Sequence, residues 1–143
     1  MILFLTEDIN FDLRDKNLIK RWLRAVAKQD GFKITDLNYI FCSDRYLLDI
    51  NKQFLGHDYY TDIITFDNKQ EEGNIVCGDI FISLDTVYIN GDIYREGFQR
   101  ELMRVMVHGL LHLTVYDDVD EKSRAKMRAA ENRALDLLAS MQG

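Results

Sequence analysis

The feature that most constrains the fold is a stretch whose side chains would be apolar on nearly every face of a helix. A helix of this kind has no solvent-facing side and must be buried by other elements. The spacing predicts a helix over residues 96–113, with the rest of the chain packed around it. Its apolar residues are Phe98, Leu102, Met103, Val105, Met106, Val107, Leu110, Leu111 and Leu113.

This helix carries two of the three histidines in the chain, His108 and His112. Residues four apart on a helix project from the same face, so both imidazoles can reach one metal ion. Asp118 follows six residues after His112, beyond the expected end of the helix, and its carboxylate supplies a third ligand. Three protein ligands leave coordination positions open, which is typical of catalytic rather than structural metal sites.

The alternative is that both histidines are ordinary core or surface residues. Buried neutral imidazoles still need partners for both ring nitrogens, and a metal would supply one partner for each ring. In the metalloprotease signature, a glutamate follows the first histidine and acts as general base. Gly109 stands at that position, so peptidase chemistry is disfavoured. We expect the glycine to open room beside the metal.

The remaining hydrophobic patterns predict an α+β fold in the order β-α-β-α-β-β-α-α-α. Such an order indicates a mixed sheet of about four strands packed with helices. A polar turn over residues 70–74 predicts that the third and fourth strands form an antiparallel hairpin. Strands are predicted at 2–6, 37–42, 61–67 and 75–83, and helices at 15–30, from Ser43 or Asp44 through Phe54, and at 85–89, 96–113 and 120–141.

Length and composition indicate a single globular domain spanning residues 1–143, because 47% of the residues are hydrophobic. No apolar run is long enough to cross a membrane, and no signal peptide is recognisable, so we expect a cytoplasmic protein with no membrane partner. The net charge of -6 argues against broad, non-specific nucleic-acid binding. A local basic patch remains open, since Lys and Arg gather at residues 14–28, 95–104 and 122–133.

Four segments, taken together and in order, resemble the bacterial YbeY family. Residues 108–118 read His-Gly-Leu-Leu-His-Leu-Thr-Val-Tyr-Asp-Asp, against His-Gly-x-x-His-Leu-x-Gly-Tyr-Asp-His in the family. Residues 50–66 resemble a family segment that contains Pro-Thr-Asp-Val-Leu-Ser-Phe, here Tyr-Thr-Asp-Ile-Ile-Thr-Phe. Gly-Asp-Ile-Phe-Ile at 78–82 and Arg-Glu-Leu at 100–102 complete the match.

The resemblance implies a zincin-like arrangement, with the sheet and helices around a central metal-binding helix. It implies a single-strand-specific, metal-dependent endoribonuclease that acts in maturation of small-subunit ribosomal RNA and in ribosome quality control. The expected partners are ribosomal RNA and the small ribosomal subunit, and no DNA. The expected cofactor is one divalent metal ion, zinc, which would polarise a phosphoryl oxygen and lower the pKa of bound water.

The chain departs from the family at three positions. Asp118 replaces the third histidine, which leaves a chemically sound site of two imidazoles and one carboxylate. Val115 replaces a glycine, and valine does not easily adopt a left-handed helix end. Leu55 replaces an arginine that, in relatives, is a candidate for phosphate contact.

Arg104 is the candidate replacement for that arginine, because it lies one helical turn before His108. Its guanidinium can bind a phosphate beside the metal, or it can pair with a carboxylate such as Glu101. His57 is expected to be an exposed loop residue. Asp62 and Asp79 lie at strand positions, and for Asp79 a structural role is favoured.

Two other functions stay open at this stage. One is a metal-dependent hydrolase of another substrate, which would turn over that substrate but not RNA. The other is a metal-stabilised ribosome-assembly factor that does not cut, which the loss of the arginine at Leu55 and the acidic composition favour.

Overall fold

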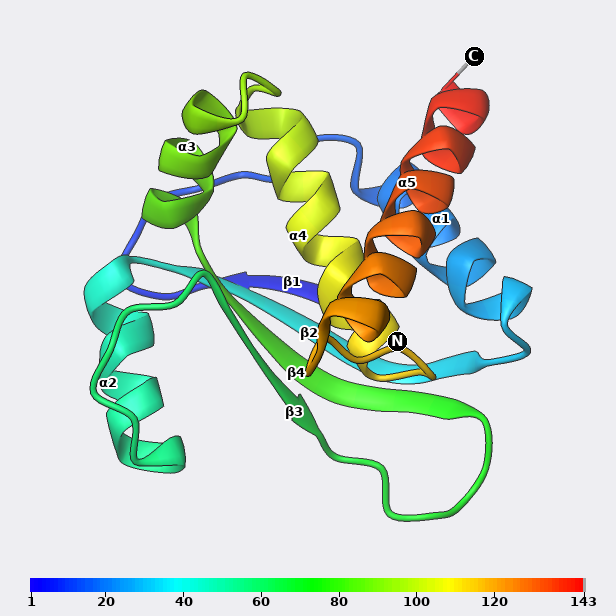
Figure 1. The fold of residues 1–143 in the computed structure, drawn as a ribbon, viewed down its shortest axis with the longest axis horizontal. Coiled ribbons are helices and arrows are strands. Elements are labelled where there is room, and N and C mark those ends of the chain that lie inside the picture. The colour runs from blue at the N-terminus through cyan, green and yellow to red at the C-terminus, as the bar shows by residue number, and fades with distance from the viewer. Residues whose placement is uncertain (143) are drawn as a thin grey trace.

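A four-stranded sheet forms the centre of the computed structural model, which describes residues 1–142 (Figure 1). The spatial order is β1-β2-β4-β3, with β1, β2 and β4 parallel and β3 antiparallel to β4. The predicted mixed sheet of about four strands and the α+β class are therefore confirmed. The strands are β1 (Ile2–Thr6), β2 (Lys33–Cys42), β3 (Ile63–Asp67) and β4 (Ile75–Ser83).

Helices cover both faces of this sheet (Figure 1). Side chains of α1, α3, α4 and α5 join the main core on one face, and α2 packs through Leu47 against Cys42 and Ile64 on the other. Along β4, fully buried residues such as Val76 and Ile80 alternate with partly exposed ones, because the face under α4 is more completely covered than the face under α2. The helices are α1 (Lys16–Gln29), α2 (Asp44–Leu55), α3 (Leu84–Ile93), α4 (Phe98–His112) and α5 (Glu121–Gln142).

Two predicted elements are too short, and each misses four residues at one end. The second strand begins at Lys33 rather than Leu37, because Lys33 and Ile34 also pair with β4, with a register shift between Ile34 and Asp36. The third helix runs from Leu84 to Ile93 rather than from 85 to 89. Its first turn is capped by Ser83, whose hydroxyl accepts a hydrogen bond from the backbone N–H of Thr86.

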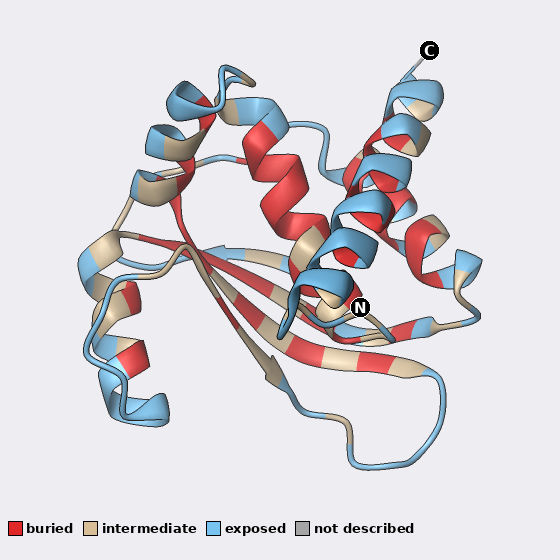
Figure 2. Ribbon diagram, viewed as in Figure 1, coloured by how far each residue is buried: buried red, intermediate tan, exposed pale blue. Residues whose placement is uncertain are grey.

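Helix α4 is the most deeply buried helix of the fold, as its apolar sequence predicts (Figure 2). The expectation that Gly109 opens room beside a metal is wrong. A Cβ atom at this position would lie 2.9 Å from Cγ2 of Ile80 and 3.0 Å from Cδ1 of Ile63. The glycine instead lets α4 lie close to the sheet, which sets the depth of the histidines above β3 and β4. None of the helices within residues 1–142 has the length and apolarity needed to span a membrane.

Candidate active site

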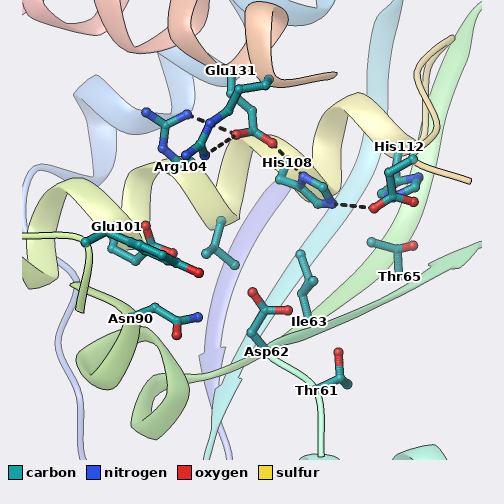
Figure 3. Close-up of a pocket in the computed structure, with 14 residues that line it drawn as sticks. Thr61, Asp62, Ile63, Thr65, Asn90, Glu101, Arg104, His108, His112 and Glu131 are labelled. Carbon is teal, nitrogen blue, oxygen red and sulfur yellow. Dashed lines mark hydrogen bonds and ion pairs between the residues drawn. The ribbon is translucent and has the colours of Figure 1, made fainter. Parts of the chain in front are cut away.

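A cavity of about 440 Å³ lies between the edge strand β3, the end of α3, and helices α4 and α5. Figure 3 shows its side chains converging from these four elements. All the predicted site residues line it, namely Arg104, His108, His112 and Asp118. The sequence-predicted residues are therefore brought to one place by the fold.

His108, His112 and Asp118 face one another at one end of the cavity. Each offers one ligand atom, and these atoms all lie within 4.8 Å of one another. Nε2 of His108 lies 3.5 Å from Oδ2 of Asp118, and Nε2 of His112 lies 3.3 Å from Oδ1 of the same carboxylate. This spacing and donor set suit a divalent transition metal, which accepts imidazole nitrogen and carboxylate oxygen together.

The segment after α4 returns Asp118 to the histidines without a left-handed residue. Leu113 ends the helix with a φ of -84°, and the positive-φ positions among the described non-glycine residues are Asp8, Asp15 and Arg95. Val115 therefore avoids the conformation that the family's glycine would favour. The replacement at this position leaves the approach of Asp118 to His108 and His112 intact.

Glu131 of α5 is a site residue that the sequence did not reveal. Nδ1 of His108 donates a hydrogen bond to Oε2 of Glu131 at 2.7 Å, since a carboxylate only accepts. This bond places the proton of the neutral ring on Nδ1 and leaves Nε2, the nitrogen that faces Asp118, free to bind a metal. The one available signal was a carboxylate among the inward residues of α5, which are Met127, Ala130, Ala134, Leu135 and Leu138.

The charge on Glu131 is maintained despite its burial. Burial alone would raise the pKa of this carboxyl group, but hydrogen bonds from His108 and Arg104 outweigh burial, and the pKa is lowered. Burial would likewise lower the pKa of His108, but the hydrogen bond and charge of Glu131 raise it. The pair is thus a stable hydrogen-bonded unit in which each partner favours the other's charged form.

Arg104 is paired with a carboxylate, and its partner is Glu131 rather than Glu101. Nη1 of Arg104 donates to Oε1 of Glu131 at 3.0 Å, and Nη2 lies 3.8 Å from Oε2 of Glu96. The side chain is buried and lines the cavity. Arg128 also reaches Oε1 of Glu131, at 3.4 Å, and is itself largely exposed at the cavity.

The other candidates fall outside or at the edge of this site. Leu55 and His57 do not line the cavity, and the His57 ring stacks on Tyr59 in an exposed loop, as expected. Asp79 accepts hydrogen bonds from Asn38 and Asn68 across the sheet, in line with its favoured structural role. Asp62 does line the cavity, and burial raises the pKa of its carboxyl group.

The cavity is acidic for a site that would hold a phosphate. Its side chains include two more carboxylates than guanidinium groups. This excess of negative charge equals in size the positive charge of one divalent cation. Because an anion entering such a cavity would be repelled, the charge balance also favours a bound cation at the histidine end. The carboxylates are Asp62, Glu101, Asp118 and Glu131, and the guanidinium groups are Arg104 and Arg128.

Comparisons with known proteins agree with this geometry. Residues 2–139 match the family model described as Endoribonuclease YbeY. An Endoribonuclease YbeY from Cytophaga hutchinsonii is 51% identical, covering 95% of this chain and 94% of the relative, and one from Parabacteroides distasonis is 46% identical, covering 96% and 95%. The solution structure of TM1509 from Thermotoga maritima superposes with a TM-score of 0.67 at 27% identity, covering 96% of this chain and 89% of that one.

Proposed function

The chain belongs to the YbeY family of endoribonucleases, and from this premise we propose that it cleaves phosphodiester bonds of single-stranded RNA at the cavity beside His108. The observation that carries the proposal is that side chains of two helices, α4 and α5, meet at His108. Helix α4 presents His108 and His112 together, and α5 supplies Glu131 to fix the first ring.

We propose that His108, His112 and Asp118 hold one divalent metal ion, and that the ion is zinc. The donor set of two imidazoles and one carboxylate suits zinc and leaves coordination positions open to substrate. When bound, the ion would supply Lewis acidity to a phosphoryl oxygen and a water of lowered pKa. The hydrogen bond to Glu131 supports this assignment, because metal-binding histidines commonly donate their second ring N–H to a carboxylate.

The surrounding residues orient the reacting groups. Glu131 holds the proton of His108 on Nδ1 and prevents the ring from rotating away from Asp118. Arg128, with its side chain 58% exposed, has spare N–H donors at the cavity mouth for an RNA phosphate. The excess of carboxylates in the cavity disfavours entry of RNA until the bound ion balances their negative charge.

We propose that Arg104 serves activity, acting on His108 through Glu131 and offering positive charge to the substrate from inside the cavity. Arg104→Lys keeps the charge but loses the planar fork. The main effect of this substitution should be a lower rate of RNA cleavage, with only a small decrease in the melting temperature. A normal cleavage rate with lowered stability would make Arg104 a purely structural residue.

We propose ribosomal RNA of the small subunit as the substrate and the cytoplasm as the place of reaction. With few free basic groups at the cavity, the protein can neutralise few phosphates at once. Each neutralised phosphate contributes about one unit to the slope of log affinity against log salt. Affinity for isolated RNA should therefore depend weakly on salt, and ribosomal partners would present the cleavage site.

Metal analysis combined with RNA cleavage tests this proposal. The purified protein should contain one equivalent of zinc and cut single-stranded RNA faster than the same sequence in a duplex. His112→Ala should lose both properties, whereas Asp136→Asn, an exposed change on α5, should keep both. Zinc and ribosome association without cleavage would instead select the assembly factor, and turnover of a different substrate would select another hydrolase.

A further inference from the structure

The end of the cavity away from His112 has its own set of polar and aromatic side chains. Asn90 and Tyr94 come from the end of α3, and Glu101 comes from the first turn of α4. Figure 3 shows Asn90 and Glu101 on the side opposite His112. A tight turn holds the two helices together, since Gly97 N–H donates to the carbonyl oxygen of Gly91 at 3.1 Å.

Glu101 is buried and lacks a partner. Only 5% of the residue is exposed, and its carboxylate makes no hydrogen bond or ion pair with any side chain or backbone group in residues 1–142. Over the same residues, the one fully buried side-chain polar atom without a partner is Nε of Arg104. The oxygens of Glu101 must therefore reach the space of the cavity that this residue lines.

Such a carboxylate is costly to keep. Burial raises the pKa of Glu101, and the charges of Asp62 and Glu96 add to that effect while Arg104 and Arg128 oppose it. The charged form of Glu101 is therefore less favourable here than in water. A ligand that brings N–H groups into the cavity would satisfy the acceptor, which gives a reason for keeping the group at this position.

Tyr94 supplies an aromatic surface to the same cavity. Tyr94 lines the cavity, and the residue is 59% exposed, which leaves its side chain accessible to a ligand. Proteins that bind single-stranded RNA stack unpaired bases on tyrosine and read the base edges with polar side chains. Asn90 offers an amide N–H₂ donor at the same end of the cavity.

We propose that Asn90, Tyr94 and Glu101 form a subsite for one unpaired guanine base of the RNA being cut, an inference that rests on the proposed ribonuclease function. A carboxylate only accepts hydrogen bonds, and guanine is the RNA base whose Watson–Crick edge presents two adjacent N–H donors. The guanine O6 atom accepts a hydrogen bond from the Asn90 amide, and the ring stacks on Tyr94. A paired guanine has its Watson–Crick edge occupied, so the subsite also selects for single strands.

Nucleotide binding and cleavage specificity test the subsite separately. Binding of guanosine, adenosine, cytidine and uridine 5′-monophosphates to the zinc-loaded protein is measured by calorimetry. Cleavage is measured on single-stranded oligonucleotides that contain one guanosine or none. The variants are Glu101→Gln, Tyr94→Ala and Tyr94→Phe. The matched control is Tyr88→Ala, which removes an equally exposed tyrosine from α3 outside the cavity.

Wild-type protein should bind guanosine monophosphate most tightly and cut next to guanosine. Glu101→Gln should reduce the guanine preference about tenfold, the range for losing a bidentate contact to a base. Tyr94→Ala should weaken binding of the monophosphate at least about fivefold, as expected for lost stacking. Tyr94→Phe should retain most of the affinity, and Tyr88→Ala should match wild type.

Equal affinity for the four monophosphates, or the same cleavage pattern in wild type and Glu101→Gln, would overturn the subsite. RNA cleavage without guanine preference would reject the subsite and leave the ribonuclease function intact. If guanine binding depends on Glu101 but the protein cuts no RNA, the subsite is supported and the ribonuclease function is rejected.

Discussion

Glu131 and His108 are 23 residues apart in the sequence and are joined by a hydrogen bond of 2.7 Å. The bond links α5 to the helix that carries both histidines, and it determines which nitrogen of His108 is free. Because Arg104 and Arg128 bind the second oxygen of the same carboxylate, the orientation of one imidazole depends on residues from two helices.

Glu131→Gln should weaken zinc binding about 10- to 100-fold, the usual effect of removing a partner that orients a metal ligand. A glutamine keeps the size of the side chain but not the charge that holds the proton on Nδ1 of His108. Competition with a chelating dye measures the affinity. Asp136→Asn, an exposed change on the same helix, is the control, and equal affinities in the two variants would contradict the prediction.

Chelation of the metal should lower the melting temperature of the wild-type protein. A ligand that binds only the folded state at 100 times its Kd stabilises it by about 2.7 kcal/mol, which corresponds to about 5–10 °C for a domain of this size. Asp118→Ala should show a smaller shift because one ligand oxygen is lost. Asp118→His should keep a large shift, since it restores the family's ligand, and a shift as small as that of Asp118→Ala would count against this ligand set.

Glu101→Gln should raise the melting temperature at pH 7 by a few degrees, because a buried charge without a partner is removed. Burial raises the pKa of Glu101 above its ordinary value of 4.5. As pH rises, the Glu101 carboxyl group therefore ionises at a lower pH in the unfolded chain than in the folded protein. The free energy of unfolding of the wild type decreases as pH rises from 4.5 to the raised pKa of the folded protein. The advantage of the variant should vanish near pH 4. Thermal melts with chelator at both pH values measure it, and a pH-independent difference would refute the assignment.

Gly78→Ala should destabilise the fold more than Gly109→Ala. A Cβ at Gly78 would lie 2.4 Å from the backbone oxygen of Phe66, whereas one at Gly109 meets only isoleucine side-chain ends at 2.9–3.0 Å. Isoleucine methyl groups can shift, but the backbone of a paired strand cannot do so without breaking hydrogen bonds. Overpacking costs about 1–3 kcal/mol, with Gly109→Ala at the lower end. Urea unfolding of both variants compares the losses, and equal losses would contradict this packing.

Much of the fold and the histidine end of the site followed from local patterns. The apolar stretch around Val105 predicted the buried helix, and the spacing of His108 and His112 predicted their common face. Asp118 could be included because it follows the same helix closely in sequence. The two histidines lie about one helical turn apart, where backbone geometry alone fixes their relative position.

The opposite wall and the partner of His108 depend on contacts between distant elements. Helix α3 was predicted to stop at residue 89. In the structure its apolar residues Tyr88, Ile89 and Ile93 are exposed, so they form no buried stripe that would mark its full length. Asn90 and Tyr94 were therefore missed. Glu131 was missed because nothing in the sequence of α5 specifies which residue of α4 it will meet.

Because His108 is held by a residue of α5, the order in which the chain is synthesised affects when the site can form. A ribosome makes α5 after the sheet and α4, so a growing polypeptide reaches a stage at which both histidines exist and Glu131 does not. At that stage His108 has no carboxylate to hold its ring, and the cavity lacks one wall. Under the proposed function, the order of synthesis would therefore delay nuclease competence until residues 121–142 have packed against α4.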